Sequence, residues 1–303
     1  MNRRTFVKQT LGASVLAGTM FSTKNVGELF AAQTMPYDLV AVKGGEPDVM
    51  FDRAIEALGG MKAFVRKGQK VVVKPNIGWD VGPERAGNTN PKLVARIIQH
   101  CFEAGAKEVN VFDHTCDDWK RSYSNSGVES AAKDAGARVV PAHSDSYYQD
   151  VTITGGKTMK DARIHELIMD ADVFINVPIL KDHTSAKLTI AMKNLMGIVW
   201  DRRYWHANDL HQCIADFAAY RKPDLNVVDA YSVLKRNGPR GVSINDVVMM
   251  KAQLISTDMV TVDAAAAKLF GSVPDDIGYI RIAAAQGLGR KDLEQLNIKR
   301  ISL

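Results

Sequence analysis

Cysteine is scarce in this 303-residue sequence, which contains only Cys101, Cys116 and Cys213. No two of them form a C-x-x-C pair, so the sequence carries no zinc-ribbon or ferredoxin-type iron–sulfur motif. An odd count of three also argues against a disulfide framework. We expect Cys101 and Cys213 to lie on apolar helix faces as small hydrophobic residues. A chain of this length can bury a sufficient core without disulfides or a structural metal.

Long hydrophobic runs and a dominant charge sign are also missing. After residue 32 no apolar stretch approaches the roughly 20 residues that span a bilayer, so we expect no stable membrane insertion of the mature chain. The formal charge of +5 includes four basic residues and one acidic residue within residues 1–32, which leaves +2 for the remainder. This balance, without a basic helix carrying interleaved aromatic residues, predicts no nucleic-acid partner.

Residues 1–32 are predicted to be an export signal. Arg3 and Arg4 precede Phe6, and the moderately apolar stretch 11–20 follows. A basic segment ahead of a short apolar segment is typical of a secretory signal, and the paired arginines resemble a twin-arginine (Tat) signal. We therefore expect the Tat export machinery as a partner and a periplasmic or otherwise exported location. A basic amphipathic helix is the alternative interpretation.

The remaining chain alternates predicted strands and helices. Short apolar runs predict buried strands at 38–43, 70–74, 109–112, 137–140, 173–177, 225–228 and 253–255. Helical patterns lie at 47–58, between Asn90 and Gly105, at 128–135, 163–171 and 188–195, after Asn208, and at 258–270 and 275–286. This alternation predicts a single α/β domain over residues 35–303, with a mostly parallel sheet and helices on both faces. Residues 141–160 are expected to form a small hairpin or flap.

Polar residues cluster where the predicted strands end. They are Lys74 and Asn76, Asp113 and His114, Lys181 and His183, Asp229, and Asp258. Open parallel sheets bind ligands outside the carboxyl ends of their strands. A lysine directly at the end of a buried strand also needs a partner for its charge. We therefore predict one pocket, at the carboxyl edge of the sheet, formed by Lys74, Lys181, His183, Lys193 and Asp258.

Residues 174–206 are rich in basic and aromatic side chains. The basic ones are Lys181, Lys187, Lys193, Arg202 and Arg203, against Asp182 and Asp201, with Trp200, Tyr204 and Trp205 among them. Basic groups among aromatic rings suit a carboxylate or phosphate on a small organic body. The alternative is a solvated basic face in which long side chains cover apolar surface.

Several of these stretches resemble the domain-of-unknown-function family 362. The resemblance runs over about residues 38–290 and rests on Lys74-Pro75-Asn76, on the segments 180–184, 192–197 and 237–241, and on Ser256-Thr257-Asp258 with Val262-Asp263-Ala264. It implies no particular reaction, because none is established for the family. Many members carry ferredoxin-like cysteine clusters. This sequence has none, so the resemblance does not extend to an iron–sulfur role.

The candidate residues suggest an enzyme acting on a small anionic molecule. Lys74 or Lys181 would hold the anion, and His183 would act as acid or base. Asp229, Asp258 or Asp263 would orient the histidine, while Asn76, Lys193, Asn194 and Arg240 would complete the binding site. Asp258 also begins a predicted helix, so a plain helix cap explains it equally well. Anion binding without turnover and a cofactor-bearing redox partner are the other function classes.

A divalent metal is the remaining alternative for this edge of the sheet. Asp113 and His114 are followed closely by Cys116, Asp117 and Asp118. Carboxylates and imidazole can ligate Mg²⁺, Mn²⁺ or Zn²⁺, although this spacing fits no standard metal motif. A polar loop with a helix cap at Asp117 or Asp118 explains the same residues. Apart from this possible metal, the sequence does not identify a cofactor.

Overall fold

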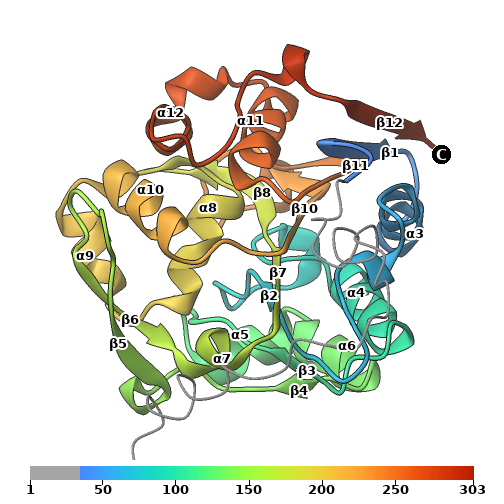
Figure 1. Cartoon of the computed structure of the whole chain (residues 1–303), viewed down its shortest axis with the longest axis horizontal. Helices are drawn as coiled ribbons and strands as arrows, with labels where there is room; N and C mark the ends of the chain where they lie inside the picture. The colour runs from blue at the N-terminus through green and yellow to red at the C-terminus, as the bar shows by residue number, and fades with distance from the viewer. Residues whose placement is uncertain (1–34) are drawn as a thin grey trace, which may run out of the picture. The chain divides into compact units, whose positions relative to one another are not determined.

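A ten-stranded sheet forms the centre of residues 35–303, the part of the chain that the computed structural model describes (Figure 1). The predicted export signal lies outside these residues. Across the main path of the sheet the strands are β12 (Ile298–Ser302), β1 (Leu39–Lys43), β11 (Val247–Ser256), β10 (Leu225–Leu234), β7 (Val173–Val177), β2 (Lys70–Pro75), β3 (Glu108–Val111) and β4 (Arg138–Val139). Met35–Leu303 form one compact unit.

The sheet is mostly parallel, as predicted. Strands β10, β7, β2, β3 and β4 each run parallel to their neighbours in that series. Two strands are exceptions: β11 runs antiparallel to both β10 and β1, and β9 (Lys187–Thr189) runs antiparallel to β8 (Ile179–His183). The valine run of β2 explains its central place. Val71 and Val73 join one core cluster and Val72 joins the other, so the strand is buried on both faces.

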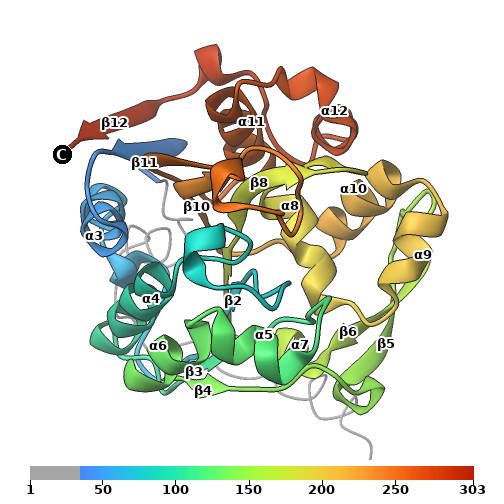
Figure 2. The same cartoon turned by 180° about the vertical axis from the view of Figure 1, so that it is seen from behind.

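Helices cover both faces of the sheet, which confirms the predicted fold class. Helices α3 (Pro47–Ala57), α4 (Pro91–Glu103) and α6 (Val128–Asp134) pack on one face. Helices α8 (Ala191–Asn194), α10 (Leu210–Tyr220), α11 (Met259–Phe270) and α12 (Gly278–Ala285) pack on the other. Both views of the molecule show α3 and α4 on the opposite side of the sheet from α8 and α10 (Figure 2).

Two predicted helices are wrong in part. The segment 163–171 begins as strand β6 (Asp161–His165), which pairs antiparallel with β5 (Tyr148–Thr152), and only α7 (Glu166–Asp170) is helical. The segment 188–195 begins as β9 (Lys187–Thr189), which pairs with the unpredicted strand β8 (Ile179–His183) before the short helix α8. The segment 188–195 is buried throughout, and an apolar run buried on several sides carries no clear period. The segment 163–171 changes from strand to helix after His165, so no single period runs through it.

Cys101 and Cys213 are buried on α4 and α10 as predicted, and Cys116 is exposed. All three thiols are free. Within residues 35–303 no helix combines the length and the apolar character needed to cross a bilayer.

The strand order changes direction beside β2. From β2 the chain passes through α4 to β3 and then to β4 on one side, whereas β7 and β10 lie on the other side. Such a switch point leaves a crevice outside the carboxyl ends of the flanking strands, where open α/β sheets bind ligands. The crevice at the carboxyl ends of β2 and β7 is therefore the first place to look for a site.

Candidate functional site

A cavity of about 670 Å³ opens where β2 and β3 end. Its volume is in the range of small-molecule sites. Five residues proposed from the sequence line it together: Asn76, Lys181, His183, Lys193 and Asn194. Asp113 and His114, the candidate metal ligands, line the same cavity. Lys74 borders the cavity through its contact with Asp113.

Lys74 is fully buried and electrically balanced. Its Nζ lies 2.8 Å from Asp113 Oδ1 and donates hydrogen bonds to Pro75 O at 2.7 Å and Asn194 Oδ1 at 3.1 Å. Burial lowers the pKa of Lys74, and the Asp113 carboxylate opposes that effect. The second carboxylate oxygen of Asp113 accepts a hydrogen bond from the Ile77 amide at 2.6 Å. Because its charge is already paired with that of Asp113, Lys74 has a structural role and is not available to bind an anionic ligand.

Lys181 lies at the cavity without a carboxylate partner. Its side chain is 1% exposed, and its Nζ donates to Asn76 Oδ1 at 3.0 Å and to the Gly87 carbonyl. Among residues 35–303 no carboxylate lies within ion-pair distance of this ammonium group, in contrast to Lys74. Burial lowers the pKa of Lys181 to about 7.

Lys193 is the least satisfied of the three lysines. It is carried by α8 and is 7% exposed, and its Nζ contacts Met196 Sδ at 3.2 Å. No oxygen of the described chain accepts a hydrogen bond from it. Burial lowers the pKa of Lys193 to about 8. A thioether is only a weak acceptor, so this cation is available to a ligand.

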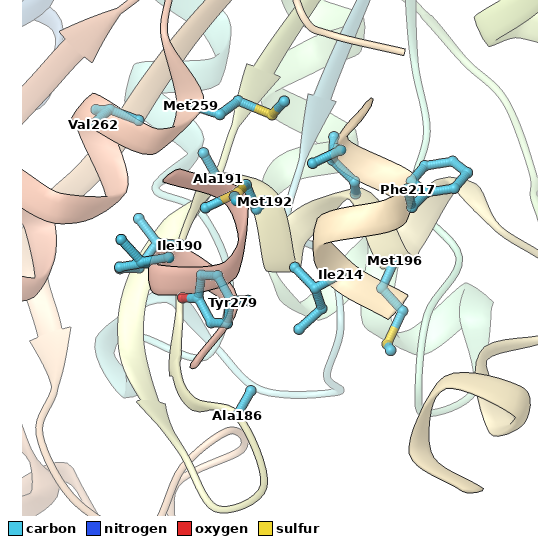
Figure 3. Packing of buried hydrophobic residues seen from close by; sticks show 14 of the residues in the cluster. Ala186, Ile190, Ala191, Met192, Met196, Ile214, Phe217, Met259, Val262 and Tyr279 are labelled. Atoms are coloured by element: carbon cyan, nitrogen blue, oxygen red, sulfur yellow. The ribbon is translucent and has the colours of Figure 1, made fainter. Parts of the chain in front are cut away.

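The hydrophobic core fixes the position of α8 by packing against the side chain of Met192. Met192 of α8 packs among Ile214 of α10, Met259 of α11 and Tyr279 of α12 (Figure 3). This packing holds α8, and with it Lys193, at the cavity.

Asparagine amides connect the lysines. Asn194 Oδ1 accepts hydrogen bonds from Lys74 and from Asn76 Nδ2, at 3.1 and 2.9 Å. Its Nδ2 donates to Asn176 Oδ1 at 2.8 Å. Asn76 in turn accepts from Lys181, so one network orients both lysines. Side-chain amides satisfy these groups without adding charge, so the network leaves the positive charge of Lys181 uncompensated.

Two histidines line the cavity in defined neutral forms. His183 Nδ1 accepts hydrogen bonds from the amides of Ser185 and Ala186, both at 3.2 Å, so its own hydrogen sits on Nε2. Burial, and then the nearby lysines, lower its pKa to about 2. His114 has the opposite tautomer, because its Nδ1 lies 2.9 Å from the Val199 carbonyl, which can only accept. His183 is therefore a hydrogen-bond donor here and not the expected resting base.

Helix α9 (Arg202–Ala207) supplies two further cations. Arg202 donates to the carbonyls of His114 at 2.7 Å and Thr115 at 2.6 Å, which ties α9 to the loop after β3. Arg203 makes no ion pair with any residue of the described chain and lines the cavity. Both arginines belong to the basic segment noted in the sequence, where nothing distinguished them as lining residues.

Gly197 is a site residue that the sequence argument did not single out for a role. A Cβ at this position would lie 1.8 Å from Asp113 Oδ1 and 2.7 Å from Lys74 Nζ. Only glycine leaves room for the ion pair there. The signal was present, because Gly197 ends one of the segments that resemble the family, but its reason is visible only in three dimensions.

Asp258 and Asp263 lie outside the cavity lining, which corrects the expected convergence. Asp258 Oδ1 caps α11 by accepting from the amides of Val260 and Thr261, at 2.8 and 3.1 Å. The reason is topological. Strand β11 is antiparallel to β10, so the residues that follow it emerge at the opposite edge of the sheet. Asp263 accepts from the Ala191 and Met192 amides that begin α8, and burial raises its pKa to about 8.

Asp229 and Arg240 also have partners away from the cavity. Asp229 lies within β10 and accepts hydrogen bonds from the amides of Asn90 at 2.7 Å and Tyr231 at 3.0 Å. Burial raises its pKa to about 6. Arg240 is exposed and pairs with Asp117 at 3.3 Å. Neither residue lines the cavity, and the expected orientation of His183 by a carboxylate is not observed.

The candidate metal ligands are engaged elsewhere. Asp118 caps α5 (Trp119–Asn125) by accepting from the Arg121 amide at 3.0 Å, and Asp113 is held by Lys74. Within residues 35–303 no group of three or more His, Cys, Asp or Glu side chains is placed to hold a metal ion. The geometry matches the polar loop with a helix cap, and the divalent metal stays a prediction.

Comparison with known proteins identifies relatives of this chain. Residues 71–268 match the family described as "Domain of unknown function (DUF362)". The thylakoid-associated protein sll1697 of Synechocystis sp. is 28% identical over 226 residues, which cover 70% of this chain and 69% of that protein.

Two solved structures show a weaker likeness. The lactate racemase apoprotein from Thermoanaerobacterium thermosaccharolyticum has 13% identity and a TM-score of 0.49, and the match covers 76% of this chain and 56% of that one. A protein from Thermotoga maritima has 10% identity and a TM-score of 0.48, with 80% and 60% covered. This chain thus spans less than two thirds of either structure. The family match takes in Lys74, Lys181, His183 and Lys193, and this chain belongs to the family of unknown function DUF362.

Proposed function

We propose that this protein is an enzyme acting on a small organic molecule that carries a carboxylate or phosphate. The observation that carries the proposal is the charge imbalance of the cavity. Three cations line it, Lys193, Arg202 and Arg203, together with Lys181, whose pKa lies near neutral pH, and the one carboxylate in the lining is already paired with Lys74. Cations held together away from water repel one another, and an anionic ligand would relieve that repulsion.

The geometry suggests a role for each group. Lys193 and Arg203, which have no oxygen partner in the described chain, would bind the anion. Lys181 would exchange a proton with the substrate, because its pKa of about 7 lies near neutral pH. His183 would donate a hydrogen bond from Nε2. Trp79, Met196 and Pro239 supply apolar walls for the organic part of the ligand.

Anion binding without turnover is the second candidate, and one observation favours it. His183, the expected acid or base, is held neutral by two backbone amides. Lys181 therefore decides between the two functions. In an enzyme, Lys181→Met would abolish product formation while a bound anion was still detected. A pure binding protein would form no product in either form.

The binding step can be tested by titrating the protein with short carboxylates and phosphate esters and recording tryptophan fluorescence, to which Trp79 at the cavity contributes. Removing one member of a desolvated charge pair costs about 2–5 kcal/mol, so Lys193→Met should weaken anion binding at least about 30-fold. The matched control is Lys187→Met, an exposed lysine of the same segment. Equal affinities of the two variants, or no binding by the unmodified protein, would contradict the proposal.

We also propose that residues 1–32 direct Tat export. The support is the sequence alone, namely Arg3 and Arg4 with Phe6 ahead of a short apolar stretch. Replacing both arginines by lysine should leave the precursor in the cytoplasm, whereas Lys24→Arg should be exported normally. Periplasmic accumulation of the double variant would refute Tat routing.

A further inference from the structure

We propose that Lys181 is a nucleophilic amine that forms an imine with the carbonyl group of a short oxo acid. The inference rests on the proposed function and narrows its substrate class to carboxylates that carry a ketone near the carboxyl group. It follows from the different surroundings of three lysines that look alike in the sequence.

The number of oxygen acceptors around each lysine separates them. Lys74 Nζ contacts three oxygens: it donates hydrogen bonds to Pro75 O and Asn194 Oδ1 and forms an ion pair with the Asp113 carboxylate, which favours the ammonium form. Lys181 Nζ contacts two, Asn76 Oδ1 and the Gly87 carbonyl. A neutral amine has two hydrogens, so both are satisfied there and the lone pair is left free. Lys193 has no oxygen acceptor in the described chain and is suited to bind a ligand's carboxylate.

Electrostatics favours the neutral amine at Lys181. Burial lowers its pKa to about 7, and the charges of Lys193 and Lys74 act in the same direction. About half of the lysine is then neutral at pH 7, compared with about one part in three thousand at the ordinary pKa of 10.5. Desolvation beside other cations is a recognised way to make lysine a nucleophile.

The cavity provides what an oxo acid would need. Lys193 and Arg203 can bind its carboxylate, and because Lys181 lines the same cavity, the adjacent carbonyl group would then face the space that Lys181 borders. The Nε2 hydrogen of His183 can bond to the carbonyl oxygen as negative charge develops on it. A phosphate ester without a carbonyl group could occupy the same cations but could not react with the amine.

The reaction balances without any oxidant or reductant. The lone pair of Lys181 Nζ attacks the carbonyl carbon, a C–N bond forms, and the C–O π bond breaks. A proton moves from the nitrogen to the oxygen to give a carbinolamine. Loss of that hydroxyl group as water, with a proton, leaves the C=N bond. The net change is amine plus ketone to imine plus water.

Reductive trapping tests the proposal. The protein is incubated with pyruvate or acetoacetate and sodium cyanoborohydride, which delivers hydride to an imine. We expect one adduct, which increases the mass of the protein by that of the oxo acid less water plus two hydrogens. Peptide mapping should place it on Lys181. Acetone, which has the ketone but no carboxylate, should give at least tenfold less adduct. Propionate, which has the carboxylate but no ketone, should protect.

The variants separate the possible outcomes. Lys181→Met should lose the adduct and Lys187→Met should keep it. If Lys181→Met fails to fold by circular dichroism, the map of the unmodified protein decides alone. An adduct on Lys193, on exposed lysines only, or equally with acetone would overturn the proposal. If propionate binds by fluorescence but neither oxo acid is trapped, this inference fails and the proposed function stands. If no carboxylate or phosphate binds, the proposed function itself fails.

Discussion

Burial of the Lys181 amino group should make the free energy of unfolding depend on pH. Its pKa is about 7 in the folded protein and about 10.5 in an unfolded chain. Between these values the unfolded state binds more protons, so the contribution of Lys181 to the free energy of unfolding rises with pH. Between pH 7 and pH 9 the two pKa values give a gain of about 2 kcal/mol. Lys181→Met has no such titration. The difference in unfolding free energy, unmodified protein minus variant, should therefore increase by about 2 kcal/mol over that range.

Urea unfolding at pH 7, 8 and 9, followed by tryptophan fluorescence and circular dichroism, measures this difference. Two buried carboxyls titrate in the opposite sense. Burial raises the pKa of Asp229 to about 6 and that of Asp263 to about 8, so their contribution is lost as pH rises. That loss affects every variant alike and cancels in the comparison. Lys187→Met, at an exposed site, should track the unmodified protein. A difference for Lys181→Met that is constant, or that shrinks as pH rises, would refute the reasoning.

Three further outcomes follow from the site. Gly197→Ala should cost about 3–5 kcal/mol of stability and lower Tm, because its Cβ breaks the buried ion pair beside the cavity; an unchanged Tm would show that the pair can shift. Thiol titration should find Cys116 reactive in the folded protein and Cys101 and Cys213 only after unfolding, and a total of one thiol would reveal a disulfide. Asp258→Ala should cost about 0.5–2 kcal/mol by removing a helix cap while anion affinity stays the same; loss of affinity would return Asp258 to the site.

The parallel part of the sheet could be predicted because its strands are buried on both faces. The valines of β2 and the apolar stretch of β7 are short, continuous and bounded by polar residues, which leaves few alternatives. The segment around His165 shows where this logic stops. His165 is fully buried and stacks on Phe112, and the strand that carries it pairs with a hairpin partner 17 residues earlier in the register Tyr148 to His165. Local sequence periodicity does not predict that pairing.

Strand direction decided which predicted site residues came together. Lys74 lies at the carboxyl end of β2, and Lys181 and His183 lie in β8, which pairs parallel with β10, so all three reach the same edge of the sheet. Asp258 also follows a buried apolar strand, but the sequence of that strand does not show whether it runs parallel or antiparallel to its neighbours. Because β11 is antiparallel, Asp258 emerges at the far edge and caps α11 instead. One reversed strand therefore removed a carboxylate from the site, and the cavity kept its excess of positive charge.

The excess charge was visible in the sequence, but its distribution was not. The acceptors that distinguish the lysines are mostly distant in the chain or belong to the backbone: Asn194 for Lys74, and Gly87 for Lys181. A carbonyl oxygen carries no sequence signal, since every residue has one. The identity of a lysine thus predicts that a cation lies at the site, whereas the number of oxygens around it determines its chemistry. Three oxygens favour a structural ammonium, two favour a free amine, and none leaves a cation for the ligand, which is why the imine is expected at Lys181 and not at its neighbours.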